Sequence, residues 1–455
     1  MEYNKSALAL ALLAIAPQAF AGGYQILEKN AQGLGRAYAG DAAIARDATT
    51  IGTNPAGMSR LRRPTFSVSA ATLDTSLNVE VEDAGVNIPS LEAAGLNPKF
   101  SSTGKNVSSD VGPSFPLIPA VYAAYPLNES YTVGLGVFSN FSSKTKYESD
   151  FISSLLAETS EVVSTNVNPS VSFALNPRVS FGFGVDAVYI QAKLSSANPN
   201  QAPLVINGAN VPNPVTGEVL VLPNGSTIGS SSIEGDDWGY GWNFGVLGEP
   251  IDGTRIGFAY RSPIQTTLEG DARFKGTPDV DSFVDFAGKA PLELPALVSL
   301  SLVQDLGNQL SLSADVTQTR WSNFKDLTIY RKDNGAASST VDERWNDSIR
   351  IALGLDYQYL PALGFRVGYA YDNSPIPDER RTLRIPTGDY RWYTAGASYT
   401  VNEMISLDLG LAHVVMARTP INDERTFVGR PFTAYAKGNA NAEGNVFATQ
   451  LNVTL

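Results

Sequence analysis

Residues Ser348–Tyr357 read SIRIALGLDY, and this stretch decides the fold class. Its odd-numbered positions are all large and apolar, whereas its even-numbered positions include Arg350 and Asp356. Successive side chains of a β-strand point to opposite faces, so the stretch predicts a strand with one apolar face and one charged face. A soluble sandwich would turn the charged face to water, and a membrane barrel would turn the apolar face to lipid.

The same period of two recurs along the chain, and from it we predict fourteen strands. The alternation is clearest in Leu363–Tyr371 and Ile405–Leu411. In chain order the predicted strands are Pro64–Leu73, Pro119–Leu127, Tyr131–Asn140, Val162–Leu175, Arg178–Leu194, Trp238–Leu247, Thr254–Pro263, Ala296–Gln304, Gln309–Arg320, Asn346–Tyr359, Leu363–Tyr371, Tyr390–Val401, Met404–Ala417 and Asn445–Leu455.

The predicted connections alternate in length. Six are short turns, such as Asn128-Glu129 and Asn402-Glu403, and seven are long, including 74–118, 195–237 and 264–295. Short turns at one end, long loops at the other and an even strand number are typical of bacterial outer-membrane barrels. We therefore expect an all-β, fourteen-stranded antiparallel transmembrane barrel in the outer membrane. A secreted sandwich or solenoid is the alternative, but it does not explain the alternating connections.

The composition limits the chemistry available to the chain. Lys and Arg total 33 and Asp and Glu total 45, so the net charge is −12, which disfavours nucleic acid as a partner. The chain has no cysteine and one histidine, His413, so disulfides, thiolate sites and multi-histidine metal sites are excluded. No Gly-x-Ser-x-Gly motif accompanies His413. We expect no enzyme, no cofactor and no metal ion.

Residues 1–21 are predicted to be a secretory signal peptide. Lys5 precedes the apolar run Ala7–Ala16, which is ten residues long and too short for the roughly 20 residues that cross a bilayer. Pro17 ends the run, and Ala19–Ala21 has the small-x-small pattern of a cleavage site. The mature protein would then divide into an N-terminal segment, 22–63, and a barrel, 64–455.

The segment 22–63 is predicted to plug the barrel from inside. It lacks the alternation of the strands and is rich in small residues. A fourteen-stranded barrel has a wide lumen, because only about eight strands close on their own side chains. We expect this segment, the hatch, to pack on the inner wall and to pair its charged residues with charges of the lumen.

Several motifs occur along the mature chain in a fixed order. They are Gly23–Gln25, Gly33–Gly40, Asn54–Met58, Trp321–Phe324, Ile351–Gly354, Arg366–Pro377 and Ile385-Pro386. Taken together they resemble the FadL/TodX family of outer-membrane transporters. The hatch motif is carried by Gly33, Gly35, Arg36, Asn54, Pro55 and Ala56.

The resemblance implies uptake of long-chain fatty acids or other hydrophobic molecules. The ligand would be caught by outer loops, move to an inner pocket and leave sideways where the third strand kinks inward. In this sequence we place that lateral gap at Ser139, Asn140, Phe141 and Ser142. An oily solute is attracted by apolar surface at about 25 cal/mol per Å² buried, so a side exit into lipid spares it a return to water.

The two expected loops 195–237 and 264–295 are unusually apolar, and the resemblance makes them the capture groove. We expect ligand contacts from Phe274, Phe283, Phe286 and Leu292, although packing of the loops on themselves is an alternative. A fatty acid also needs a cation or donors for its carboxylate. Lys193 and Arg261 are our candidates, with a role as rim charges as the alternative. Where fatty-acid carriers of this family place basic side chains, the sequence offers Ser195, Ser196 and Asn346, which favours a neutral ligand.

The expected function is therefore passive import of long-chain fatty acids by a monomer. Import of neutral aromatic or aliphatic hydrocarbons is the first alternative, and a general diffusion porin or an adhesin is a further one. Besides the hydrophobic cargo, we expect outer-membrane lipid and lipopolysaccharide as partners. The sequence Asp-Glu-Arg at 342–344, 378–380 and 423–425 would place charges in outer loops, either solvated or bridged to lipopolysaccharide by divalent cations.

Overall fold

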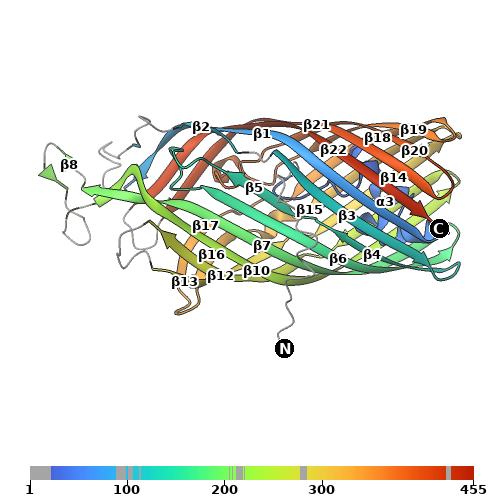
Figure 1. Ribbon diagram of the computed structural model, residues 1–455, viewed down its shortest axis with the longest axis horizontal. Helices are drawn as coiled ribbons and strands as arrows, with labels where there is room; N and C mark the ends of the chain where they lie inside the picture. Colours follow the sequence, from blue (N-terminus) through green and yellow to red (C-terminus); the bar gives the residue numbers. More distant parts are fainter. Residues whose placement is uncertain are drawn as a thin grey trace.

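The computed structural model describes residues 22–88, 99–100, 106–111, 114–203, 205–206, 209–211, 219, 221–276, 284–426 and 432–455. The expected signal peptide and Phe283 lie outside these residues. Within them the chain forms one closed antiparallel barrel of fourteen wall strands (Figure 1), so the predicted fold class is confirmed.

Some wall strands are continuous, and others consist of two β-segments with a break between them. In chain order they are β1 (Thr65–Asn87), β3 (Ser114–Pro126), β4 with β5 (Tyr131–Phe138, Ser142–Lys146), β6 (Thr159–Asn176), β7 (Val179–Pro203), β10 (Val221–Ile251), β11 with β12 (Thr254–Arg261, Ile264–Lys275), β13 with β14 (Phe286–Leu294, Leu297–Leu306), β15 with β16 (Leu310–Thr319, Asp326–Arg331), β17 with β18 (Ala337–Asp342, Ser348–Leu360), β19 (Leu363–Asp372), β20 (Tyr390–Thr400), β21 (Ile405–Thr426) and β22 (Thr433–Thr454). The short strand β2 (Ser108–Asp110) pairs with β1, and β8 (Val205–Ile206) pairs with β9 (Ala209–Asn210).

The first and last wall strands close the barrel. They pair from Thr65 opposite Thr454 to Asn87 opposite Thr433, with one irregularity between Val81 and Asp83. The C-terminus lies at the end of the barrel where the short turns gather (Figure 1). This closure joins the two ends of the sheet, so neither β1 nor β22 presents its full edge to lipid.

The wall is apolar outside and polar inside. Ile349, Ile351 and Leu353 on β18 are 46%, 50% and 59% exposed, whereas Arg350 and Asp356 on the same strand are only 5% and 8% exposed. A soluble protein would bury the first set and expose the second. The inversion is what lipid on one side and a polar lumen on the other require, and it confirms the assignment of the two faces made from the sequence.

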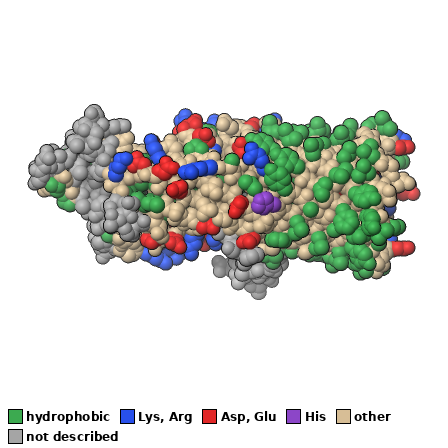
Figure 2. Space-filling model, turned by 90° about the horizontal axis from the view of Figure 1, so that it is seen from above, with side chains coloured by type: hydrophobic (Ala, Val, Ile, Leu, Met, Phe, Trp, Pro, Cys, Tyr) green, Lys and Arg blue, Asp and Glu red, His purple; other side chains and the backbone are tan. Residues whose placement is uncertain are grey.

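The lipid-facing band covers only part of the barrel's length. Figure 2 shows hydrophobic side chains gathered toward the short-turn end, and charged side chains over the outer half. His413, exposed on β21, lies where one surface gives way to the other. The exposed aromatic residues Trp238, Tyr240 and Trp242 on β10 face outward, as an interfacial girdle would.

The strands extend farther outward than the sequence pattern indicated. β10 begins at Val221 rather than at Trp238, and the expected loop 264–295 is largely occupied by β12 and β13. The expectation of long loops there was wrong. Beyond the lipid-facing band the outer face of a strand need not be apolar, so the ladder continues after the alternation in hydrophobicity has ended.

Short helices precede the first wall strand and occupy the interior. They are α2 (Ala31–Leu34), α3 (Asp41–Ile44), α4 (Thr50–Thr53) and the 3-10 helix η2 (Pro55–Arg60); outside this segment the 3-10 turns are η3 (Trp321–Asn323) and η4 (Asp378–Arg380). No helix in the described part of the chain is long and apolar enough to cross a bilayer. Nearly every residue from Gly22 to Met58 is buried, because the segment lies against the inner wall.

Candidate functional site

Three cavities follow one another inside the barrel. An outer pocket of about 280 Å³ lies toward the outer ends of the strands, and an apolar pocket of about 80 Å³ adjoins it. Leu194, Ile233 and Arg384 line both of them. A polar cavity of about 80 Å³ lies farther in, between the N-terminal segment and the wall. Because neighbouring cavities share walls or a thin partition, they outline a path along the barrel interior.

The outer pocket brings together two of the aromatic residues predicted from the sequence. Phe274 on β12 and Phe286 on β13 have ring centroids 6.4 Å apart, and both line the pocket. The guanidinium of Arg331 lies 4.4 Å from the centroid of Phe286. The pair therefore offers a fixed apolar surface at the outer entrance, with a cation nearby.

The adjoining apolar pocket is lined by aliphatic side chains and ends on an aromatic cluster. Leu292, also predicted from the sequence, lines it with Leu268 and Phe324. Tyr24 lines its inner end, and the Tyr24 ring meets Trp321 edge-on with centroids 4.6 Å apart. A hydrocarbon chain in this pocket would replace no strong hydrogen bond and would gain the full benefit of apolar burial.

Arg384 is the cation that both pockets share. It lies between η4 and β20, is 8% exposed, and its Nη1 donates to Ser160 Oγ at 3.0 Å and to the Ser195 carbonyl at 3.3 Å. It forms no ion pair with any described carboxylate. A buried guanidinium held only by neutral acceptors is incompletely compensated, and an anionic ligand would supply the missing charge.

Arg425 on β21 adds a second cation to the outer pocket. Its side chain is 6% exposed, and its Nε and Nη2 atoms are buried without a hydrogen-bond partner among the described residues. Glu343, between β17 and β18, also faces the apolar pocket and accepts a 2.7 Å hydrogen bond from Trp345 Nε1. Burial raises the pKa of Glu343 to about 7. Glu343 and the buried Asp423 carboxylate both act on the two arginines electrostatically, but neither forms an ion pair with them in the described part of the chain.

The cations predicted from the sequence lie elsewhere. Lys193 is exposed and pairs with Glu234 at 3.3 Å beside the polar hollow on the outer wall. Arg261 is buried against the Asp186 carboxylate and lines the polar cavity. The structure thus brings neither residue to the aromatic pair. Ser195 and Ser196 do line the outer pocket.

One wall strand is interrupted beside the apolar pocket. The third wall strand stops at Phe138 and resumes at Ser142, the position expected for the lateral gap. β4 pairs with β3, whereas β5 pairs with β6, and no ladder joins β5 to β3 among the described residues. The outer half of β3 therefore has no partner on this side, so the wall lacks its usual hydrogen bonds here.

The N-terminal segment bridges this break in the strand. The Ile26 amide donates to the Asn140 carbonyl at 2.8 Å, and the Ser142 amide donates to the Tyr24 carbonyl at 2.9 Å. Gln25 thereby faces Phe141 as an isolated antiparallel bridge. Ser139, Asn140 and Phe141 are all buried. The segment Tyr24–Ile26 therefore lies both at the inner end of the apolar pocket and along the strand break.

The hatch motif fixes the N-terminal segment internally and on the wall. Arg36 donates to the Gln32 and Ala39 carbonyls at 3.1 Å and pairs with Asp41 at 3.3 Å. Asn54 donates to the Ala42 carbonyl at 2.7 Å and to the wall carbonyl of Val246 at 3.0 Å. The remaining motif residues sit at close contacts: Gly33 under Tyr38, Gly35 against Arg366, Pro55 at the start of η2, and Ala56, whose carbonyl accepts from Ser180.

Wall glycines let the hatch backbone approach closely. A Cβ added to Gly257 would lie 2.0 Å from the Ala42 carbonyl oxygen, and one added to Gly368 would lie 2.2 Å from the Arg36 carbonyl carbon. Both contacts are with backbone, which cannot swing aside. The fit of hatch to wall thus depends on the missing side chains at these two positions.

Valine at Gly257 or Gly368 is expected to push the hatch off the wall and to open a steady ion-conducting path. The measurement is the conductance of the purified variant in a planar lipid bilayer, compared with the unaltered protein. Gly248→Val is the matched control, because a Cβ there would meet no atom within 4 Å. A folded Gly257→Val protein with unchanged conductance would contradict this prediction.

Comparisons with known proteins agree with the barrel fold. The family described as "Outer membrane protein transport protein (OMPP1/FadL/TodX)" matches residues 12–455. A long-chain fatty acid transport protein of Escherichia coli O6:H1 is 31% identical, covering 90% of this chain and 91% of that protein. The structure of a Pseudomonas aeruginosa FadL homologue superposes with a TM-score of 0.82 at 21% identity, over 95% of this chain and 99% of that one. The toluene transporter TodX of Pseudomonas putida superposes with a TM-score of 0.63 at 15% identity, over 94% and 99% of the two chains.

Proposed function

The chain belongs to the OMPP1/FadL/TodX family of outer-membrane transport proteins, and we propose on this premise that it imports long-chain fatty acids passively. Its barrel lies in the bacterial outer membrane. The proposal assigns the chain no catalytic step, because transport down a gradient needs only binding, passage and release.

One observation supports a fatty acid over other hydrophobic cargo. Arg384 and Arg425 are buried beside an apolar pocket, and neither has a carboxylate within ion-pair distance among the described residues. Burying a charge without a partner is costly. A ligand with an apolar chain and an anionic head would fill the pocket and compensate the arginines at the same time, which a hydrocarbon cannot do.

The proposed path begins at the outer pocket. The cargo first covers Phe274 and Phe286, then places its chain in the apolar pocket with its carboxylate at Arg384. It leaves through the break at Phe138–Ser142, where no ladder joins β5 to β3 among the described residues. The Tyr24–Ile26 segment closes the inner end of the pocket. Its movement would switch the protein between a state that holds the cargo and a state that releases it.

We further propose that the chain consists of a signal peptide (1–21), a hatch (22–63) and a barrel (64–455). The protein would act as a monomer surrounded by membrane lipid and lipopolysaccharide. The charged outer half of the wall supports contact with lipopolysaccharide. An example of its surface charges is Arg418 on β21, which pairs with Glu80 and Glu82 on β1 across the intervening strand β22. Closure of the wall by β1 and β22 supports a monomer, since neither terminal strand needs a strand of a second copy.

A second candidate cargo is a neutral hydrocarbon. The lining of the apolar pocket favours it, since Leu268, Leu292 and Ile329 would accept any oily molecule. A deletion strain complemented with the gene separates the two: growth on oleate but not on alkane or toluene would support the fatty acid. Growth restored on hydrocarbon alone would replace the first proposal with the second.

The aromatic pair of the outer pocket gives a further prediction. Phe274→Ala with Phe286→Ala is expected to weaken binding of both oleate and oleyl alcohol about tenfold, because loss of each ring removes apolar surface that either ligand would cover. Equilibrium binding of the two ligands to the detergent-solubilised variant checks this. Phe365→Ala, at an exposed position on the lipid-facing wall, is the control. Unchanged affinity for both ligands would remove the pair from the site.

A further inference from the structure

A single short segment of the hatch separates the apolar pocket from the polar cavity. Tyr24 lines the first, whereas Gln25, Leu27 and Lys29 line the second. The segment is held to the strand break by the Ile26 and Ser142 amides described above. Cargo that passes the Tyr24 ring therefore arrives beside the break and the polar cavity at once.

Lys29 is the cation at this point. It is 9% exposed, and its Nζ donates a 3.0 Å hydrogen bond to Asn140 Oδ1, an amide of the strand break. It forms no ion pair with a described carboxylate. Burial, followed by the neighbouring Arg261, lowers the pKa of Lys29 to about 8, which is the behaviour of an ammonium whose charge is poorly compensated.

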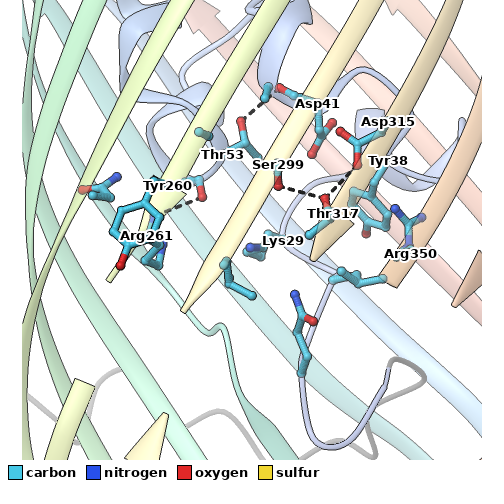
Figure 3. A pocket seen from close by; sticks show the side chains of 17 residues that line it. Lys29, Tyr38, Asp41, Thr53, Tyr260, Arg261, Ser299, Asp315, Thr317 and Arg350 are labelled. Carbon is cyan, nitrogen blue, oxygen red and sulfur yellow. Dashed lines mark hydrogen bonds between the residues drawn. The ribbon is translucent and has the colours of Figure 1, made fainter. Parts of the chain in front are cut away.

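Apart from Arg350, the other charged side chains around the polar cavity have partners of their own, either an opposite charge or a hydroxyl group. Arg261 pairs with Asp186, Asp41 pairs with Arg36, and Asp315 accepts from the Ser301 and Thr317 hydroxyls. Figure 3 shows Lys29 lying between Arg261 on one side and Arg350 on the other.

Arg350 strengthens the preference for an anion in this cavity. It donates to the Ala37 carbonyl, but its Nε is buried without a hydrogen-bond partner among the described residues. Lys29 and Arg350 are thus two buried cations that line one cavity and have no ion-pair partner in the described chain. Asp41 and Asp315 also line the cavity, but neither forms an ion pair with Lys29 or Arg350 in the described chain, and Lys29 is the cation that contacts the strand break.

We propose that Lys29 receives the carboxylate of the cargo at the strand break, after the carboxylate has left Arg384. The inference rests on the proposed function and adds a second carboxylate position to it. A carboxylate oxygen would replace the Asn140 amide oxygen as the acceptor from Lys29, because an ammonium forms a stronger hydrogen bond with a charged acceptor than with a neutral one. The exchange frees Asn140 from the hatch, so arrival of the head group is coupled to loosening of the break.

The test separates passage from binding. Lys29→Gln is expected to slow oleate uptake about tenfold, in line with loss of one charged hydrogen bond, while oleyl alcohol uptake stays unchanged. The equilibrium affinity for oleate, set by Arg384, is expected to stay within twofold or so of the original. Lys29→Arg keeps the charge and is expected to retain most of the oleate uptake, and Lys146→Gln, at an exposed lysine on β5, is the control.

The outcomes are distinguishable. Oleate uptake by Lys29→Gln at the rate of the unaltered protein would overturn the inference, as would equal losses for oleate and oleyl alcohol. Acetate that inhibits oleate uptake by the unaltered protein, but not by Lys29→Gln, would show that Lys29 binds small free carboxylates. That result would also overturn the inference. Failure of the unaltered protein to bind oleate would instead remove the proposed function, and this inference with it.

Discussion

Arg384→Gln combined with Arg425→Gln is expected to weaken oleate binding about 100-fold or more, because each guanidinium contributes a charged hydrogen bond of about 1.5–3 kcal/mol to the carboxylate. Oleyl alcohol, which has the same chain without the charge, should bind within about threefold of its original affinity. Titration calorimetry or a fluorescent fatty acid, measured on the detergent-solubilised protein, gives both numbers. The affinity ratio between the two ligands is the decisive quantity.

The control for this double variant is Arg391→Gln, at an exposed arginine on β20. It removes a positive charge from the barrel without touching either pocket, so it should leave both affinities unchanged. Thermal unfolding shows whether the double variant is folded. Equal losses for oleate and oleyl alcohol in a folded protein would mean that the arginines shape the pocket without recognising a carboxylate, and the fatty-acid proposal would then lose its support.

Pinning the hatch to the strand break is expected to stop transport almost completely. Gln25 and Phe141 face each other across an antiparallel bridge, flanked by the two hydrogen bonds of the Ile26 and Ser142 amides. Such a pair has Cα atoms about 4.5 Å apart, within the range of a disulfide. The chain has no cysteine of its own, so Gln25→Cys with Phe141→Cys can form only this cross-link within one chain. Under oxidation oleate uptake should fall by roughly tenfold or more, and reductant should restore it.

The matched control crosses two wall strands that have no proposed motion. Leu353→Cys with Tyr369→Cys joins residues directly opposite each other on β18 and β19, both facing outward. Oxidation of this pair should not change uptake. Suppose that the hatch cross-link forms fully and oleate uptake is as fast as in the same variant treated with reductant. The Tyr24–Ile26 segment then does not need to leave the break, and the release step proposed above is wrong.

The sequence identified the barrel because lipid imposes a strict pattern. In the lipid-facing band every second side chain must be apolar, and Ile349, Ile351 and Leu353 show this clearly. Outside the band that constraint disappears, so the outer parts of β10, β12 and β13 looked like loops. The strand is interrupted between Phe138 and Ser142, in the region where the resemblance implies a lateral gap. The segment that bridges this break, Tyr24–Ile26, could not be predicted from alternation.

The proposed carboxylate site could not be predicted from the sequence for a different reason. Arg425 belongs to an Asp-Glu-Arg triplet that was expected in an outer loop, yet it lies on β21, where Ile421, Asp423 and Arg425 alternate inward. That period of two was the signal that could have revealed it. Arg384 lies in an irregular segment next to Ile385, where no periodicity indicates direction. Lys193 and Arg261 were predicted to bind the carboxylate because they lie near strand ends. Lys193 instead points outward and pairs with Glu234, and Arg261 pairs with Asp186.

The most direct test is to locate a heavy-atom cargo. Anomalous diffraction from crystals of the protein grown with 9,10-dibromostearate places the middle of the acyl chain without reference to activity. The account predicts bromine peaks inside the apolar pocket, between Leu292, Phe324 and Tyr24, with the carboxylate density at Arg384. Bromine peaks confined to the lipid-facing wall, with the pocket empty at saturating ligand, would contradict it.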